Sequence, residues 1–306
     1  MIDISAQISD PVPSRALLTD NPAEILGFAL ARFKEGNGVA LATLVEIRGG
    51  AARALGSHLV VAADGRFCGY VSGGCVEAAV ASEALLAISE GCDRVVMFGD
   101  GSPFFDIVLP CGGGISVAIH LLRDSSRIEC VLDRLDRRQA SGLSYCSVRQ
   151  SLEVVEPPQR ACWQNGRFLT VYHPRTRIII SGQAVEVKAV ARLSTASDFE
   201  VIFQEPGRAV ADIDAYTAIV ALHHDLDQEA SVIEAALNSE AFYVGALGST
   251  RTHKRRVERL IRLGYGNRDL DRIRAPIGVF GPTRDSTSLA LSILADVAAS
   301  RLAIYG

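Results

Sequence analysis

The sequence predicts an α+β domain over residues 1–172, followed by an α/β Rossmann-like domain with a mostly parallel sheet over residues 173–306. The length of 306 residues is that of about two ordinary domains. The segment 143–172 alternates between apolar and polar residues, which is typical of antiparallel strands. Beyond residue 173, short apolar runs alternate with helical patterns, as they do around a parallel, doubly wound sheet.

The first half opens with a predicted helix over 21–35. Asn21 can cap it, Pro22 suits its first position, and its apolar residues recur at the helical period. A second helix follows the turn 72–75 and ends near Glu90. Asp64-Gly65 is a hairpin signal between two strands. The remaining elements of this half are expected as strands at 38–47, 56–62, 66–71, 93–98, 104–109 and 115–122, and as a polar helix at 127–140.

The second half begins with a β-branched strand over Arg177–Ser181, followed by Gly182 and a helix to about Ala196. Strand and helix then keep alternating, which is the pattern of βαβ units. The further strands are expected at 200–204, 217–222, 242–245 and 277–280, and the further helices at 227–238, 251–263 and 285–303.

Charge and hydropathy exclude several classes of protein. The net charge of −4 provides no overall positive field for nucleic acid or an anionic membrane. No uncharged apolar run approaches the roughly 18 residues of a membrane-spanning helix. The longest such runs, 38–45 and 286–295, are flanked by acidic residues. We therefore expect neither a nucleic-acid partner nor a membrane span.

Seven cysteines, an odd number with no CxxC pair, all lie before residue 163. The N-terminus has acidic residues and lacks the apolar segment of a signal peptide. These features predict a reduced, cytoplasmic protein without a zinc site. Any thiol chemistry belongs to the N-terminal half.

Two of these cysteines lie in glycine turns. Cys75 follows Gly73-Gly74 where a helix begins, and free helical N–H groups there favour a thiolate or an anion. Glu77 lies in the first helical turn, where a carboxylate is favoured. Cys111 precedes Gly112-Gly113-Gly114, a stretch that lets the backbone approach a ligand closely. The alternative is that both cysteines are small core residues, the interpretation we adopt for the other five.

The N-terminal half resembles the XdhC/CoxI family of molybdenum-hydroxylase maturation factors. The matching stretches are GYVSGGCVE (69–77), LPCGGGISV (109–117) and LGSHLVVAADG (55–65) after Arg53. The C-terminal half continues the resemblance in the same order, through FYVGALGSTRTHKRR (242–256), IRAPIG (273–278) and LSILAD (291–296).

The resemblance implies a chaperone that binds a molybdopterin-type molybdenum cofactor and supports its sulfuration. Such a protein inserts the cofactor into the apo large subunit of a xanthine-dehydrogenase or CO-dehydrogenase type enzyme. It implies Cys111 and Cys75 as the reactive thiols, a cysteine desulfurase as a second source of sulfur, and a homodimer. The candidate cofactor-binding residues of this half are Arg53, Gly73, Gly74, Glu77, Gly112 and Gly113. Arg53 is the candidate cation, and a salt bridge is its alternative role. Its loop is Gly50-Ala51-Ala52-Arg53, whereas the family has Ser-Ser-Pro-Arg, so two hydroxyls are absent.

The second half carries only part of a dinucleotide fingerprint. Gly182 matches the first glycine of G-x-G-x-x-G, but Ala184 and Val187 replace the others. Glu205 lies where an acid would meet a ribose hydroxyl. NAD(P) binding stays open on this pattern, and so does a domain kept for packing or for contact with a partner.

A better anion site follows the strand 242–245, where Gly248-Ser249 open a helix that carries Arg251 and Lys254. For Arg256, Arg259 and Arg262 we expect a solvated helix face. The pair His223-His224 ends another strand at the ligand-binding edge of such sheets, and His224 matches a histidine of the family.

Three functions remain open from the sequence. The first is the cofactor chaperone, which is an accessory protein more than a turnover enzyme. The second is an NAD(P)-linked oxidoreductase, which the missing glycines disfavour. The third is a non-catalytic binding or regulatory paralogue, which the altered motifs of the second half favour.

Overall fold

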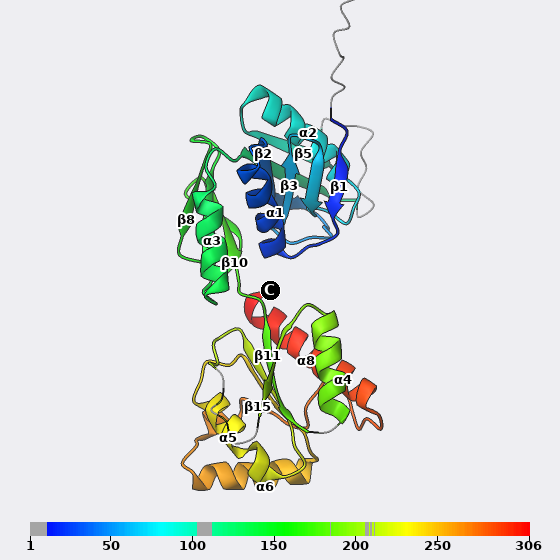
Figure 1. Ribbon diagram of the computed structural model, residues 1–306, viewed down its shortest axis with the longest axis vertical. Helices are drawn as coiled ribbons and strands as arrows, with labels where there is room; N and C mark the ends of the chain where they lie inside the picture. Colours follow the sequence, from blue (N-terminus) through cyan, green and yellow to red (C-terminus); the bar gives the residue numbers. More distant parts are fainter. Residues whose placement is uncertain (1–10, 103–111, 184, 206–207, 209, 211) are drawn as a thin grey trace, which may run out of the picture. The chain divides into compact units, whose positions relative to one another are not determined.

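The computed structural model describes residues 11–102, 112–183, 185–205, 208, 210 and 212–306 (Figure 1). The chain divides into two compact units, Met1–Tyr172 (unit 1) and His173–Gly306 (unit 2). Unit 1 mixes helices with two largely antiparallel sheets, and unit 2 has one parallel sheet between helices. The predicted fold class is confirmed.

Unit 1 is built on a six-stranded sheet of order β1-β4-β3-β2-β6-β5. All neighbouring pairs are antiparallel except β1 with β4. Asp64-Gly65 forms the predicted hairpin turn between β3 and β4, and Gly65 has a φ of +86°. The strands are β1 (Ser14–Leu17), β2 (Val39–Arg48), β3 (His58–Ala62), β4 (Arg66–Gly69), β5 (Arg94–Gly99) and β6 (Gly114–Leu121).

Two helices cover the two faces of this sheet. Helix α1 (Pro22–Lys34) begins after Asn21, whose side chain accepts from the Ala23 N–H, and it packs with Leu41 and Val60 on one face. Helix α2 (Glu77–Glu90) packs its alanine-rich side on the other face. The sheet is therefore buried on both sides, which explains why β3 and β6 are apolar or buried along their whole length.

A smaller antiparallel sheet of order β8-β7-β10-β9 completes unit 1. Helix α3 (Ser126–Asp136) packs Ile128 and Val131 into the same core as Leu143. The strands are β7 (Ser141–Cys146), β8 (Ser151–Val155), β9 (Cys162–Gln164) and β10 (Arg167–Tyr172).

Asp93 joins the two sheets of unit 1. Its carboxylate accepts from the Leu121 N–H at 3.1 Å, from Tyr145 Oη at 3.1 Å and from Arg123 at 2.9 Å, and it lies 2.6 Å from His120 Nδ1. The side chain is 3% exposed. Burial alone would raise the pKa of Asp93, but these partners hold that pKa below its ordinary value.

We expect Asp93→Asn to lower the free energy of unfolding of unit 1 by about 2 kcal/mol, because an amide loses the charge-assisted bonds and turns a donor toward donors. Tyr145→Phe removes one of these bonds and should cost about 1 kcal/mol. Urea unfolding followed through Trp163, the single tryptophan, measures both. Equal stability of Asp93→Asn and the wild type would contradict this role.

Unit 2 has a parallel sheet of order β12-β11-β13-β14-β15. Helices α4 (Val185–Ala196) and α8 (Ser286–Tyr305) share one core cluster, and α5 (Leu226–Leu237) and α6 (Thr250–Arg262) share the other. Figure 1 shows the two helix pairs on opposite sides of the sheet. The strands are β11 (Arg177–Gly182), β12 (Glu200–Gln204), β13 (Thr217–Leu222), β14 (Tyr243–Ala246) and β15 (Ile273–Arg274).

Three details differ from the sequence prediction. The fifth strand of unit 2 is Ile273–Arg274, and not 277–280, where Val279 and Phe280 are about half exposed. The short helix α7 (Asn267–Leu270) and the strand β1 were not predicted, because each is too short to show a period. The strand predicted at 104–109 lies outside the described residues.

One described helix, α8, is long and apolar enough to cross a membrane by composition. Ala290, Ile293 and Val297 are nevertheless fully buried against α4 and the sheet. This packing is that of a core helix of a globular domain.

Candidate functional site

Three loops of unit 1 leave its six-stranded sheet at the same edge. Strands β2 and β4 run in the same direction because both are antiparallel to β3, and they end at Arg48 and Gly69. Strand β6 runs the opposite way and begins at Gly114, which pairs with Arg48. The loops 49–57, 70–76 and 112–113 therefore emerge side by side.

Two of the predicted glycines lie where these loops touch. A Cβ at Gly113 would fall 2.5 Å from the carbonyl oxygens of Arg48 and Gly50, and a Cβ at Gly73 would lie 3.3 Å from the Ala52 Cβ. The loop 49–53 thus lies between the two glycine turns. We call residues 49–53, 72–75 and 112–113 the three-loop site.

The Cys75 thiol is exposed and free within this site. Helix α2 begins two residues later, at Glu77, and the Cys75 N–H donates to Ser72 Oγ at 3.1 Å. The amide of Cys75 is therefore engaged by its own turn, which differs from the free helical N–H expected from the sequence. Gly74, with a φ of +108° and open space around it, leaves the sulfur uncovered.

Glu77 holds this turn from beneath. Its carboxylate is 1% exposed and accepts from the N–H groups of Val71 at 3.2 Å and Ser72 at 2.8 Å, and from Ser72 Oγ. A side chain so engaged positions the Cys75 turn and has little capacity left to contact a ligand. The sequence placed Glu77 as a direct cofactor contact, and the geometry points to this indirect role.

Arg53 forms the salt bridge that the sequence left open as its alternative role. Its guanidinium forms an ion pair with Asp20 at 2.6 Å and lies 5.0 Å from the centre of the Tyr70 ring. The same three residues line a cavity of about 170 Å³ in unit 1. Asp20 and Tyr70 were not predicted from the sequence, although Tyr70 belongs to the matching stretch 69–77.

Cys111 lies outside the described residues. Gly112, directly after it, is exposed and has a φ of +68°, a left-handed conformation that glycine adopts without strain. Of the other cysteines, Cys68 and Cys146 are buried, and burial raises the pKa of Cys68 to about 11. A buried thiol of this kind is inert, as the core interpretation predicted for these two. Cys92 and Cys130 are only partly buried, and Cys162 is exposed on β9, so the core interpretation is wrong for Cys162.

In unit 2, the carboxyl edge of the sheet brings together several predicted residues. The order of the strands reverses between β11 and β13, which is the position where such sheets bind ligands. Gly182 has a φ of +153°, and a Cβ there would lie 2.8 Å from the Leu222 carbonyl oxygen. Packing between the two strands thus requires this glycine, whether or not a nucleotide binds.

The two histidines at this edge point in different directions. His223 is 4% exposed, and its Nε2 lies 2.8 Å from Ser181 Oγ at the end of β11. His224, which the sequence favoured, is exposed beside Asp225, the N-cap of α5. The histidine that lies at the reversal point is therefore His223.

The predicted anion site lies at the start of α6. Ser249 caps the helix by accepting from the Thr252 N–H, and Gly248 has a φ of +127°. Arg251 and Lys254 are exposed one turn apart, and neither has an ion-pair partner among the residues that the structure describes. Two free cations beside a helix N-terminus are suited to an anion.

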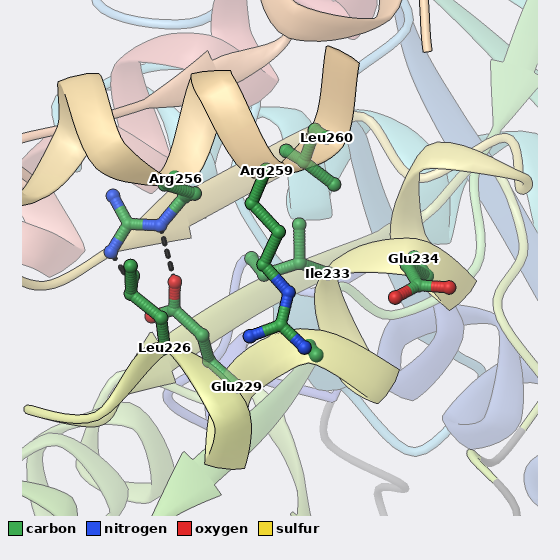
Figure 2. A pocket seen from close by; sticks show the side chains of 8 residues that line it. Leu226, Glu229, Ile233, Glu234, Arg256, Arg259 and Leu260 are labelled. Carbon is green, nitrogen blue, oxygen red and sulfur yellow. Dashed lines mark hydrogen bonds and ion pairs between the residues drawn. The ribbon is translucent and has the colours of Figure 1, made fainter. Parts of the chain in front are cut away.

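Arg256 corrects the prediction of a solvated helix face. Arg256 is 2% exposed. Its Nε and Nη2 both pair with the carboxylate of Glu229 in α5, and Nη2 lies 3.0 Å from Oε2 (Figure 2). Its Nη2 also donates to the Leu247 carbonyl oxygen at 2.7 Å. Arg259 pairs with Asp227, an exposed residue, and Arg262 is exposed as predicted.

No cluster of three or more histidine, cysteine or acidic side chains with metal-site geometry occurs in the described part of the chain. The groups that the three-loop site offers are the Cys75 thiol, the Arg53 cation and close backbone contacts.

The chain matches two family models, described as the XdhC and CoxI family over residues 33–99 and the XdhC Rossmann domain over residues 178–297. It is 47% identical over 292 residues to the molybdenum cofactor insertion chaperone PaoD of Escherichia coli, covering 95% of this chain and 92% of that protein. The chain belongs to the XdhC/CoxI family.

A solved structure from Bacillus halodurans, described as a xanthine dehydrogenase, has a related fold. The TM-score is 0.71 at 19% identity, over 92% of this chain and 96% of the other. At this identity the likeness concerns the fold alone.

Proposed function

We propose that this chain binds the molybdenum cofactor as cargo and inserts it into the apo large subunit of a molybdenum hydroxylase. The observation that carries the proposal is the three-loop site, with its exposed Cys75 thiol. The Escherichia coli relative of this chain, at 47% identity, is a molybdenum cofactor insertion chaperone. In this proposal the protein is an accessory factor, without turnover of its own.

The chemistry of the site suits this cargo. A molybdopterin cofactor is anionic and carries a molybdenum atom that a soft sulfur ligand can approach. Cys75 supplies an uncovered sulfur, and Arg53, at the end of the neighbouring loop 49–53, supplies a cation. Gly73 and Gly113 allow the neighbouring loops to close on one another without side chains between them. These residues therefore form the proposed binding surface, together with Gly74 and Gly112.

Protein purified without oxygen from cells that make the cofactor should release a fluorescent pterin after oxidation. We expect Cys75→Ser to lower the amount of bound pterin about tenfold, because loss of a soft ligand weakens metal sites by that order. Cys162→Ser is the matched control, since Cys162 is also exposed but lies on β9, outside the three-loop site. Wild-type protein without pterin would overturn the proposed function.

The same measurement on Cys111→Ser tests the second predicted thiol. A cysteine desulfurase is the proposed source of sulfur, and Cys75 or Cys111 the proposed acceptor.

Capture of a hydroxylase large subunit by cofactor-free protein would instead support a regulatory paralogue. Gel filtration tests the proposed homodimer.

Two further parts of the proposal concern unit 2 and the compartment. Ser249, Arg251 and Lys254 are the proposed second anion-binding surface, with Gly248 forming the turn. We leave NAD(P) out of the proposal, because Gly182 is accounted for by packing. The six described cysteines are free thiols, which supports a cytoplasmic location.

A further inference from the structure

A cavity of about 170 Å³ opens in unit 1 between the start of α1, the loop 53–57 and the end of β10. Its polar side chains are those of Asp20, Arg53, Ser57, His58 and Tyr70. An apolar cavity of about 150 Å³ is large enough to hold a benzene ring. The volume of the cavity is therefore enough for a planar ring and larger than a single water molecule needs. The apolar lining comes from Pro22, Ile25, Leu55 and Val171.

Few polar atoms of this cavity remain available to a ligand. Ser57 Oγ donates to the Ala54 carbonyl oxygen at 2.8 Å. The two ring nitrogens of His58 are engaged by Thr43 Oγ1 at 3.0 Å and Tyr172 Oη at 2.6 Å. The polar side chains that remain for a ligand are therefore Asp20, Arg53 and Tyr70.

Asp20 and Arg53 hold one another beside an aromatic ring. Besides the Arg53 guanidinium, the Arg15 guanidinium lies 4.2 Å from the centre of the Tyr70 ring. Arginine planes and aromatic rings are the surfaces on which proteins stack heteroaromatic rings. Asp20 pairs with Arg53 through Oδ2, and its side chain is 64% exposed, so both carboxylate oxygens can still accept hydrogen bonds from a ligand.

We propose that this cavity is the subsite for the pterin ring of the cargo, and that the Asp20 carboxylate recognises its 2-amino-4-oxo edge. This edge presents two parallel N–H donors, which match the two oxygens of a carboxylate. The ring stacks on the Arg53 guanidinium, which itself lies over the Tyr70 ring. This inference rests on the proposed function, and it specifies which part of the cargo unit 1 reads.

The position of the cavity supports this assignment. Arg53 directly follows Ala52, which touches Gly73 of the Cys75 turn, and Tyr70 precedes that turn by two residues. The cavity and the three-loop site are thus the two sides of one loop. A ligand with a pterin at one end and a metal at the other can use both.

The test compares two free rings as probes, pterin and lumazine (2,4-dioxopteridine), which carries an oxygen in place of the 2-amino group. Their binding is followed by their own fluorescence. We expect wild-type protein to bind pterin about tenfold more tightly than lumazine, because a bidentate pair of this kind discriminates by about that order. Asp20→Asn should abolish the preference. An amide side chain offers one acceptor and one donor, which no longer match the two N–H donors of pterin better than the donor and carbonyl acceptor of lumazine.

Asp133→Asn is the matched control. Asp133 is similarly exposed and pairs with Arg137 at 3.0 Å, but it lies on α3, away from the cavity. It should keep the tenfold preference. Equal binding of the two rings by the wild type, binding of neither, or an unchanged preference in Asp20→Asn would overturn the pterin subsite. The proposed function is tested separately, by the cofactor content of the purified wild-type protein.

Discussion

Glu229→Gln is expected to lower the free energy of unfolding of unit 2 by about 3–5 kcal/mol, because it leaves the Arg256 charge buried without a counter-charge. Both side chains are about 3% exposed, so water cannot replace the lost partner. Figure 2 shows the guanidinium of α6 facing the carboxylate of α5 within the small pocket between these helices.

The same two helices contain the control. Asp227 of α5 pairs with Arg259 of α6, but its side chain is 82% exposed. Asp227→Asn should therefore cost less than about 1 kcal/mol. The slowest amide hydrogen exchange in α5 and α6 measures both variants. Equal effects of the two substitutions would contradict the importance of burial.

A double variant separates the charge from the packing. Glu229→Leu with Arg256→Met replaces the buried pair by apolar side chains of similar size, and such replacements are often neutral or stabilising. We expect it to recover most of the stability lost in Glu229→Gln. The Leu247 carbonyl oxygen would still lose its donor, so exchange of the amides in the turn before α6 should remain faster than in the wild type.

Much of the fold could be predicted because it depends on local signals. Asn21-Pro22 fixes the start of α1, and Asp64-Gly65 fixes a hairpin, since each pattern constrains the backbone where it occurs. The alternation of strand and helix after residue 173 sufficed for a parallel sheet. The glycines of the three-loop site were also visible, because only glycine permits such close approach.

What could not be predicted depends on residues distant in sequence. The apolar residues of helix α6 are few and lie on one side, and hydropathy does not show that the charged Arg256 faces inward with them toward Glu229. The pairing of Asp20 with Arg53 likewise joins an N-terminal segment to a loop 33 residues later. Such contacts follow from the packing of the sheet, which no local pattern specifies.

The stability of unit 1 is expected to fall as the pH is lowered from 6.5 to 4, and His58 is the cause. The ring is buried between Thr43 and Tyr172, and burial lowers its pKa from 6.5 to about 4, although a hydrogen bond with the Ala42 backbone acts in the opposite direction. Between these two pH values His58 is protonated in the unfolded chain and neutral in the folded unit. The unfolding free energy is therefore unaffected above pH 6.5 and falls by about 3 kcal/mol in total below pH 4.

His58→Gln removes this titration and gives the measurement its reference. Urea unfolding of both proteins, followed through Trp163 in unit 1, gives the difference in their unfolding free energies at each pH. The stability advantage of the wild type should shrink by about 2.5 kcal/mol between pH 7.5 and pH 4.5, because only the wild type carries the buried imidazole. The carboxylates titrate alike in both proteins and cancel, so a constant difference would mean that the imidazole is protonated as readily in the folded state as in the unfolded chain.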